Sequence, residues 1–381
     1  MSNRPTLLIL SISRIVSDPR VLKQVTLFKD RYDVTTCGQG PAPDGVAKHY
    51  ELPPNARGWV DDRVALIAHQ YRRAYRNISG VAAARQMLPV GTFDAILAND
   101  LNTLPLALEL KPRRGVHTDL HEFAPREKES DLAWRLFVAP FLRWVCRNYL
   151  SKAASATTVA EGIAREYEKD YSVDFGVVTN AAPYSERSPR PVGDPIRLIH
   201  SAAGQRQRCL ENFIELMKDA PDGVELDLIV MPNEPDYVSE LKRAGAGVPG
   251  LRFRDPVPYS ELIDLLTEYD VALNFLPPLN FNHAHALPNK FFEAVQARLG
   301  LIIGPSIEMT SILERYGLGE VTKDFTVDSL RSAIAELTPE KVMKWKEAAN
   351  RAARPLSAEE QNVGWLVPIA ELLGEPRFTN R

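Results

Sequence analysis

Short apolar runs alternate with amphipathic stretches along the first half of the chain. The run T-L-L-I-L-S-I over residues 6–12 predicts a buried strand, because a short continuous apolar segment fits a strand covered on both faces. The stretch over residues 18–28 places its apolar residues at helical spacing, with Asp18 as the expected N-cap and Pro19 at the first helical position. This pattern predicts a strand followed directly by a helix.

The alternation continues to residue 181. Further strands are predicted over residues 33–38, 93–100, 115–122 and 175–181, and residues 153–160 lead into another helical run. Repeated strand–helix units indicate a parallel sheet with helices on both faces. Asn99 and Asp100 end one of these strands, which is where such sheets place ligand-binding loops.

A second series of the same kind fills the other half of the chain. Residues 185–195 are rich in proline and charge and indicate a linker. After this linker, strands are predicted over residues 196–202, 224–230, 270–275 and 299–304, with a helix over 208–218 and a closing amphipathic helix over 365–373. The chain is therefore expected to hold two α/β sheets in tandem.

We expect the fold class α/β, with two parallel-sheet domains facing across a cleft that would be the natural ligand site. A chain of 381 residues is too long for one ordinary core and fits two domains. The expected bounds are 1–185 for the N-terminal domain, 186–195 for a linker, 196–355 for the C-terminal domain and 356–381 for a final helical segment.

Composition and charge agree with a soluble, two-domain protein. Hydrophobic residues make up 45% and charged residues 25%, which is typical of globular proteins. Residues 1–190 carry 26 Lys and Arg against 21 Asp and Glu, whereas residues 191–381 carry 20 against 28, so the two halves differ in character. The three cysteines are far apart and predict neither a disulfide framework nor a zinc site. A cytoplasmic location is the expectation, since no apolar run is long enough to span a membrane.

The stretch L-P-N-K-F-F-E over residues 287–293 carries the most specific chemistry. Lys290 and Glu293 lie at the start of a predicted helix, where free backbone N–H groups and the helix dipole favour an anion such as phosphate. A carboxylate does not bind phosphate, but it accepts hydrogen bonds from paired hydroxyls such as those of a ribose. The alternative is a first-turn glutamate that favours the dipole and a solvated lysine.

Several common nucleotide and catalytic motifs are absent from the sequence. No G-x-G-x-x-G follows the first predicted strand, and there is neither a phosphate loop of the G-x-x-x-x-G-K-[ST] type nor a G-x-S-x-G elbow. No D-x-D triplet is present to hold a metal on a diphosphate. His283 and His285 lie close together, but no Cys, Asp or Glu completes a metal site beside them, so none is predicted.

Several stretches together resemble the family 4 glycosyltransferases, which have the GT-B fold of two Rossmann-like domains. The resemblance implies that the C-terminal helix returns to the N-terminal domain. The similarity runs over most of the chain and is strongest over residues 287–306, which resemble the donor-binding stretch of that family. Residues 257–274 are similar to the segment before it, and residues 17–25 and 119–123 are similar to a subset of bacterial members. The resemblance implies a retaining transferase that uses a nucleotide sugar, linked to UDP or GDP, without an essential metal or other cofactor.

The resemblance also implies roles for residues of the C-terminal half. Glu293 would bind the ribose hydroxyls, and Lys290 with the backbone amides of Leu287, Pro288 and Asn289 would form the diphosphate site, although proline itself has no N–H to donate. In the family a second basic residue follows a glycine-bearing loop. This loop corresponds here to residues 200–211, with Gly204, with Arg208 as the best match and Arg206 as the alternate. A guanidinium at this position would stabilise the leaving diphosphate, or it could simply be solvated.

One position departs from the family pattern. Members often carry two glutamates separated by seven residues, and the place of the first glutamate is taken here by His285. An imidazole can exchange hydrogen bonds with a sugar hydroxyl but cannot supply a carboxylate. The contact to the donor sugar therefore cannot be carried over from the family.

In the N-terminal half, the resemblance assigns His121 to the transferred sugar and Glu122 to the acceptor or to a neighbouring cation. Both residues end a predicted strand, although a satisfied loop histidine and a surface acid are the alternatives. Arg20 follows the first strand and could reach phosphate or acceptor, or could pair with Asp18 at the helix start.

Residues 134–152 place aromatics and arginines at helical spacing. A buried helix whose arginines extend to solvent is one interpretation, and a peripheral membrane helix that would favour a lipid-linked acceptor is the other.

The sequence thus predicts a hexosyl-type glycosyltransferase that moves a sugar from a nucleotide sugar to a hydroxyl acceptor, such as a cell-surface glycan, a glycolipid or a metabolite, with no nucleic-acid partner. The alternatives are a nucleotide-sugar epimerase on the same fold and a degenerate transferase that serves as a partner subunit.

Overall fold

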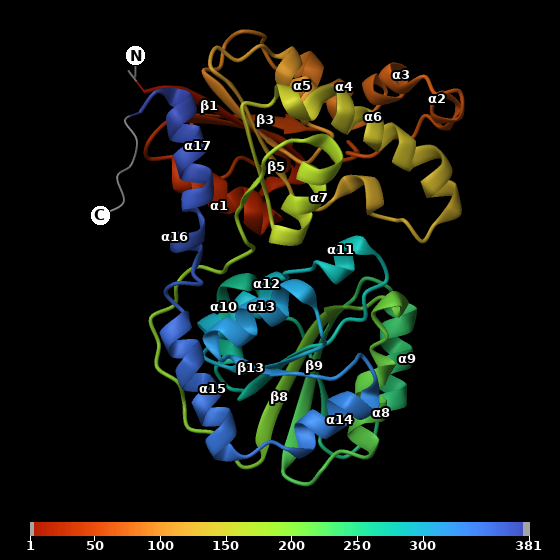
Figure 1. Cartoon of the computed structure of the whole chain (residues 1–381), viewed down its shortest axis with the longest axis vertical. Helices are drawn as coiled ribbons and strands as arrows, with labels where there is room; N and C mark the ends of the chain where they lie inside the picture. Colours follow the sequence, from red (N-terminus) through yellow and green to blue (C-terminus); the bar gives the residue numbers. More distant parts are fainter. Residues whose placement is uncertain (1–3, 376–381) are drawn as a thin grey trace. The chain divides into compact units, whose positions relative to one another are not determined.

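The computed structural model describes residues 4–375 and divides into two compact α/β units (Figure 1). The N-terminal unit consists of Met1–Thr179, Asn280–Asn282 and Asn362–Arg381, and the C-terminal unit of Asn180–Leu279 and His283–Gln361. Residues 1–3 of the expected N-terminal domain and residues 376–381 of the expected final segment lie outside the described residues. The segment that the sequence assigned to a linker falls within the C-terminal unit.

The N-terminal unit is built on a parallel sheet of seven strands in the order β3-β2-β1-β4-β5-β6-β7. The strands are β1 (Thr6–Arg14), β2 (Asp33–Gln39), β3 (Lys48–Leu52), β4 (Ala95–Asn99), β5 (Gly115–Leu120), β6 (Ser155–Thr158) and β7 (Gly176–Val177). The strand order reverses between β1 and β4, and ligands of doubly wound sheets bind beyond the carboxyl ends of the strands at such a point.

Helices and helical turns cover both faces of this sheet. They are η1 (Ile15–Ser17), α1 (Pro19–Phe28), α2 (Arg63–Ile67), α3 (Tyr71–Arg76), α4 (Ser79–Met87), α5 (Leu104–Glu109), η2 (Ala124–Arg126), η3 (Trp134–Val138), α6 (Ala139–Tyr149), η4 (Leu150–Lys152), α7 (Glu161–Tyr171) and α17 (Val363–Leu373). The expected start of the first helix is confirmed, because Asp18 accepts hydrogen bonds from the backbone N–H groups of Arg20 and Val21.

The last helix returns to the N-terminal sheet, as expected. Helix α17 lies beside α1 (Figure 1), and Trp365, Ile369 and Leu373 join the core formed by β1, β4 and α1. Trp365 and Ile369 are fully buried. Helix α17 therefore completes the hydrophobic core of the N-terminal unit.

The C-terminal unit repeats the same plan with six parallel strands in the order β10-β9-β8-β11-β12-β13. The strands are β8 (Ile196–Ala203), β9 (Val224–Met231), β10 (Leu251–Arg254), β11 (Val271–Asn274), β12 (Gly300–Ile303) and β13 (Gly319–Val321). The remaining helices are η5 (Arg206–Arg208), α8 (Glu211–Lys218), α9 (Pro235–Gly245), α10 (Tyr259–Leu266), α11 (Phe281–Ala284), α12 (Asn289–Gln296), α13 (Ile307–Tyr316), α14 (Val327–Ala335), α15 (Pro339–Ala352) and α16 (Ala358–Gln361). The strand order of this sheet reverses between β8 and β11.

The expected fold class is confirmed for both units, but several elements were not predicted individually, among them the short helices α2 and α3 and some short strands. Strands β3, β10 and β13 lack a counterpart in the predicted pattern, and each is an edge strand. An edge strand is paired on one side only and is more exposed, so its apolar signal is weak. The helix at α8 also begins later than expected, because residues 206–208 form the separate turn η5.

The aromatic stretch over residues 134–152 forms η3, which is a π-helical segment, followed by α6 and the turn η4. Trp134, Phe141 and Val145 are buried, whereas Arg135 and Arg143 are exposed. This is the geometry of the buried-helix interpretation. Between residues 4 and 375 no helix combines the length and apolar character needed to cross a membrane.

Candidate functional site

A buried ion pair anchors the carboxyl ends of the N-terminal strands. Arg20, near the start of α1, donates to both carboxylate oxygens of Asp119 on β5, each at 2.7 Å. Its guanidinium also donates to the Val178 carbonyl at 2.8 Å and lies 4.7 Å from the ring centroid of Trp365. These contacts engage the Arg20 guanidinium with Asp119, Val178 and Trp365, so it acts as a positioning residue in this structure.

Asp119 is the hub of this network. It also accepts hydrogen bonds from Gln24 at 2.9 Å and from Thr157 at 2.7 Å. Burial alone would raise the pKa of this carboxyl, but the charge and hydrogen bonds of Arg20, with help from His121, outweigh burial and hold the pKa well below its usual range. Asp119 is therefore a fixed negative charge at the end of β5.

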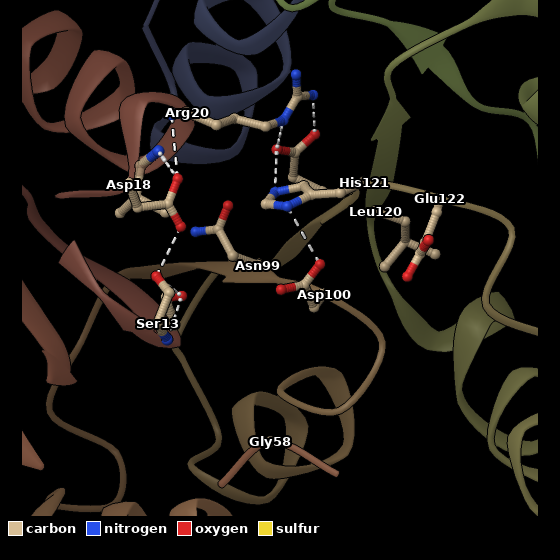
Figure 2. A network of polar contacts seen from close by, with 12 residues as sticks. Ser13, Asp18, Arg20, Gly58, Asn99, Asp100, Leu120, His121 and Glu122 are labelled. Carbon is tan, nitrogen blue, oxygen red and sulfur yellow. Dashed lines mark hydrogen bonds and ion pairs between the residues drawn. The ribbon is translucent and has the colours of Figure 1, made fainter. Parts of the chain in front are cut away.

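His121 lies between two carboxylates (Figure 2). Its Nδ1 is 3.3 Å from Asp100 Oδ1, and its Nε2 is 3.6 Å from Asp119 Oδ2. Burial would lower the pKa of the imidazole, but the two acidic neighbours outweigh it and raise the pKa. His121 is thus held in place and biased toward its protonated form.

Asp100 follows β4 in a left-handed conformation, with φ of 66°. Aspartate tolerates this region better than most residues, and such backbone outliers cluster at functional sites. Desolvation by the surrounding protein raises the pKa of its carboxyl although 43% of the side chain is exposed. Asp100 thus presents an accessible carboxyl beside His121.

Glu122 follows His121 and lies in a partly buried position. Burial raises the pKa of its carboxyl to about 8, with smaller contributions from the charges of Glu127 and Asp100. A carboxyl with this pKa is mostly protonated at neutral pH, so Glu122 can donate a hydrogen bond as well as accept one.

These strand ends form one wall of a cavity of about 570 Å³ within the N-terminal unit. Asp100, His121 and Glu122 supply polar groups, while Trp59, Trp134, Val138, Phe141 and Leu142 are among the apolar residues that line it. A volume of this size is typical of small-molecule sites. His121 and Glu122 both line this cavity, and their roles toward sugar and acceptor stay predictions.

In the C-terminal unit, residues 287–293 form the start of α12 and the two residues before it. Leu287 is buried and Pro288 occupies the N-cap position, so the helix begins at Asn289. Lys290 donates to the Ser201 carbonyl at the end of β8, at 3.2 Å. Burial, together with the charge of Arg208, lowers the pKa of Lys290 to about 8, against a smaller opposing effect of Glu293.

The structure distinguishes the two candidate arginines on η5. Arg206 forms an ion pair with Glu240 at 2.5 Å, and 61% of its side chain is exposed. Arg208 points inward: its Nε is buried and has no hydrogen-bond partner in the described part of the chain, and burial lowers the pKa of its guanidinium. Across residues 4–375 no carboxylate forms an ion pair with Arg208 or Lys290. Two neighbouring cations that no ion pair neutralises, with Glu293 as the acidic group whose charge acts on Lys290, form a site suited to an anion.

Glu293 is 6% exposed and lies one turn into α12 from Lys290. A small hollow beside it is lined by Ser201, Asn274, Lys290 and Glu293. Asn274 ends β11 and is 2% exposed, and its Oδ1 has no hydrogen-bond partner among the residues that the structure describes. Buried polar atoms are normally paired, and this hollow of about 10 Å³ has room for one hydrogen-bond donor the size of a water molecule or a single ligand hydroxyl.

A carboxylate lies beside the histidine that replaces the family glutamate. His285 Nδ1 is 2.9 Å from Oε1 of Glu308, which lies in the first turn of α13 and is buried. His285 is thus paired with a carboxylate from an element distant in sequence.

Close packing against β9 accounts for a glycine at position 204. A Cβ at this position would lie 2.4 Å from the Met231 carbonyl oxygen, so only glycine fits against β9. Its predicted contact with the donor stays a prediction.

Several residues of these sites were not predicted from the sequence as site residues. They are Gln24, Asp100, Asp119, Ser201, Asn274 and Glu308. Asp100 had a signal, since it ends a predicted strand. The others become neighbours only when strands and helices distant in sequence pack together.

The sequence matches no protein-family model and no curated protein. Solved structures do match over nearly the whole chain. Alr3699/HepE from Anabaena, determined in complex with UDP and glucose, superimposes with a TM-score of 0.69 at 14% identity, covering 96% of this chain and 100% of that chain. This protein has the GT-B fold.

Two further GT-B structures are similar to the same extent. Sucrose-phosphate synthase from Thermosynechococcus elongatus superimposes with a TM-score of 0.69 at 10% identity, covering 97% of this chain and 99% of that chain. A glycosyltransferase from Rickettsia africae gives a TM-score of 0.68 at 11% identity, with 98% and 100% covered. At such low identity, the likeness establishes the GT-B fold and leaves substrates to the chemistry of the sites.

Among residues 4–375 no three His, Cys, Asp or Glu side chains gather to form a candidate metal site. Metal independence stays a prediction.

Proposed function

We propose that this GT-B protein is a glycosyltransferase that moves a sugar from a nucleoside-diphosphate donor to a hydroxyl acceptor. In this reaction the bond between the anomeric carbon and the diphosphate oxygen breaks, and the diphosphate keeps the electron pair. The acceptor oxygen bonds to the anomeric carbon and loses its proton. The family resemblance implies that the configuration of the sugar is retained without a metal.

The paired cations of the C-terminal unit carry this proposal. Arg208 and Lys290 are partly buried, close enough for the charge of one to lower the pKa of the other, and have no carboxylate ion pair among the described residues. Such an arrangement is electrostatically costly until an anion binds. A leaving diphosphate gains negative charge as its bond to the sugar breaks, so these cations would stabilise that charge.

Glu293 and its hollow supply the second half of the nucleotide site. We assign Glu293 to the ribose hydroxyls, because it is a buried acceptor one turn from Lys290. We assign His285 with Glu308 to the donor sugar, since this pair restores a carboxylate near the position where the family has one. UDP is the first nucleotide to test, because structural neighbours are complexes with UDP and with UDP-2-fluoro glucose.

The acceptor is assigned to the N-terminal cavity. His121 would contact a hydroxyl of the transferred sugar, and Glu122 and Asp100 would contact the acceptor. Arg20 fixes Asp119, which in turn orients His121.

Isothermal titration calorimetry with UDP, GDP and ADP tests the nucleotide site. Glu293→Ala and Arg208→Ala each remove one charged hydrogen-bonding group, which weakens binding by about 1.5–3 kcal/mol, or roughly 10- to 150-fold. Arg206→Ala is the matched control on the same turn, because its side chain points to solvent. It is expected to leave nucleotide affinity unchanged.

The alternatives give different outcomes in the same experiments. An epimerase would convert a nucleotide sugar to its epimer without any acceptor, which nuclear magnetic resonance of the donor detects. A degenerate partner subunit would bind no nucleotide while remaining folded. Equal losses of affinity in Arg206→Ala and Arg208→Ala would also reject the assigned diphosphate site.

A further inference from the structure

The cavity of the N-terminal unit has two chemically different walls. The polar wall carries Asp100, His121 and Glu122 next to strand ends. Further polar groups of the lining belong to Ser13, Tyr75, Asn102, Glu127, Lys128 and Tyr167. The apolar wall comes from η3, α6 and the loop at residues 58–60. Its lining residues include Trp59, Trp134, Val138, Phe141 and Leu142. In Figure 2, Gly58 of this loop lies beyond Asp100, on the side away from His121.

We propose that this cavity binds the apolar body of an amphipathic acceptor, whose hydroxyl lies against Asp100, His121 and Glu122. That the bound compound is the acceptor rests on the proposed function, whereas the affinity of the cavity for an apolar body does not depend on that function. It names the class of acceptor: a compound with an alkyl, prenyl or similar apolar group attached to a hydroxyl-bearing head.

A purely polar acceptor fits this cavity poorly. Each sugar hydroxyl that leaves water without a new hydrogen bond costs free energy, and aliphatic side chains such as Val138 and Leu142 offer no such bonds. Aromatic rings such as Trp134 could stack on one sugar face, but they could not replace the hydrogen bonds of the sugar edge. An apolar body gains free energy from the same wall in proportion to the area it buries.

The electrostatics of the polar wall agree with an apolar neighbour. The pKa of Glu122 is raised to about 8, with burial as the largest cause. Such burial means that water solvates this carboxyl poorly even before a ligand arrives. The groups whose charges act on it are Glu127, Asp100, His121 and Lys128.

The cavity is also accessible. Trp59 lines it and is nevertheless 63% exposed, so the apolar wall reaches the surface at this residue. Leu136 on η3 is 55% exposed but does not line the cavity, and it provides a control on the same element.

A series of n-alkyl β-glucosides from butyl to octyl, used below their micelle concentrations, tests the proposal by isothermal titration calorimetry on the full chain. Each buried methylene is expected to strengthen binding roughly fourfold until the cavity is filled. Glucose itself is the reference without an apolar body. No increase of affinity with chain length would overturn the proposal.

Leu142→Trp fills the cavity and is expected to remove the dependence on chain length, whereas Leu136→Ser keeps it. Trp59→Ala is a second cavity variant that cannot leave a buried void, because Trp59 is largely exposed; it is expected to weaken octyl glucoside binding several-fold while the protein stays folded. An unchanged dependence on chain length in both cavity variants would place the binding elsewhere and overturn the proposal.

The source of the acceptor is distinguished by vesicles. Co-sedimentation with phosphatidylcholine vesicles that contain dodecyl glucoside, lost in Leu142→Trp, would support a membrane-held amphiphile. Binding of the soluble series without co-sedimentation would support a soluble amphiphile.

UDP binding, measured on the same samples, separates the two proposals. UDP binding without any alkyl glucoside binding overturns the acceptor class and leaves the transferase function standing. Chain-length-dependent binding of alkyl glucosides without nucleotide binding supports the cavity proposal and rejects the transferase.

Discussion

At the scale of single residues, the protein keeps two kinds of buried charge. Arg20 and Asp119 neutralise each other, so this pair serves to hold strand ends in place. Arg208 and Lys290 are both positive and lack such compensation by an ion pair among the described residues. The charges of the first pair are therefore neutralised without a ligand, whereas those of the second pair are suited to a bound anion.

The depressed pKa of Lys290 predicts proton uptake on nucleotide binding. In the free protein its pKa is about 8, so about half of the molecules carry an uncharged Lys290 at pH 8. A bound diphosphate favours the charged amine and raises the pKa of Lys290. Binding of UDP should therefore be accompanied by uptake of about half a proton by Lys290 at pH 8 and almost none at pH 6. Calorimetry at pH 8 in buffers of different ionisation enthalpy measures this number.

The control for proton uptake is Lys290→Met, which should bind UDP weakly and without linked uptake. Equal uptake at pH 6 and pH 8 in the wild-type protein would contradict the assignment of the proton to Lys290.

Breaking the Arg20–Asp119 pair should strongly destabilise the N-terminal unit. Asp119→Asn leaves the Arg20 guanidinium buried without its counter-ion, which is expected to cost about 3–5 kcal/mol in the free energy of unfolding. Chemical denaturation followed by circular dichroism measures the loss. Because the pKa of Asp119 is depressed in the folded state, the stability it supplies is present above the ordinary aspartate pKa and is lost as the pH falls below it.

The surface pair Arg57–Asp61 is the matched control for this prediction, with both side chains more than half exposed. Asp61→Asn should change the free energy of unfolding by less than about 1 kcal/mol. A comparable loss in both variants would mean that the buried pair has no special structural role.

At the scale of elements, the N-terminal core depends on a helix from the other end of the chain. Trp365 on α17 is fully buried, and it contacts Arg20 through its ring. Helix α17 also lies on β4, β5 and β6. Helix α17 therefore packs against Arg20 and the neighbouring strands and helps to hold the Arg20–Asp119 pair in place.

Trp365→Ala should destabilise the N-terminal unit by about 3–5 kcal/mol, because it removes a large buried side chain and leaves a cavity. Amide hydrogen exchange should show the loss of protection in β1 and β4, while β8 and β11 stay protected. Val363→Ala, at a side chain 39% exposed on the same helix, should have little effect. Faster exchange in the C-terminal strands would contradict the placement of α17 in the N-terminal core.

At the scale of the whole molecule, the two units have separate cores and separate candidate sites. A nucleotide that binds only to the C-terminal unit should therefore stabilise that unit. The stabilisation should be about 2.7 kcal/mol at a ligand concentration of 100 times Kd.

Differential scanning calorimetry with UDP tests this expectation. One unfolding transition should move to higher temperature with UDP, and the other should stay in place. Octyl glucoside should move the other transition. Glu293→Ala should abolish the first shift and leave the second, and a shift of both transitions by UDP alone would contradict separate sites.

Local sequence patterns predicted the central elements well because those elements carry strong local signals. Helix α1 has a capping aspartate, a proline at its first position and a regular apolar face, and each acts within a few residues. The central strands are continuous apolar runs because both faces are covered. Edge strands such as β3 have weaker signals, so they were missed.

The candidate sites divide in the same way. The sequence by itself determined two parallel α/β units, the start of α12 with Lys290 and Glu293, and the strand ends that carry Asp100 and His121. These features depend on hydrophobic periodicity and on helix and strand termini, which are properties of neighbouring residues in the chain.

The tertiary structure alone decided the partners. It paired Arg206 with Glu240, brought Glu308 to His285, bound Arg20 to Asp119 and opened an apolar cavity beside His121. Each of these outcomes joins residues from elements that are distant in sequence. Burial and charge at such positions arise from packing between elements, and no local pattern records which side chains will share the same low-dielectric space.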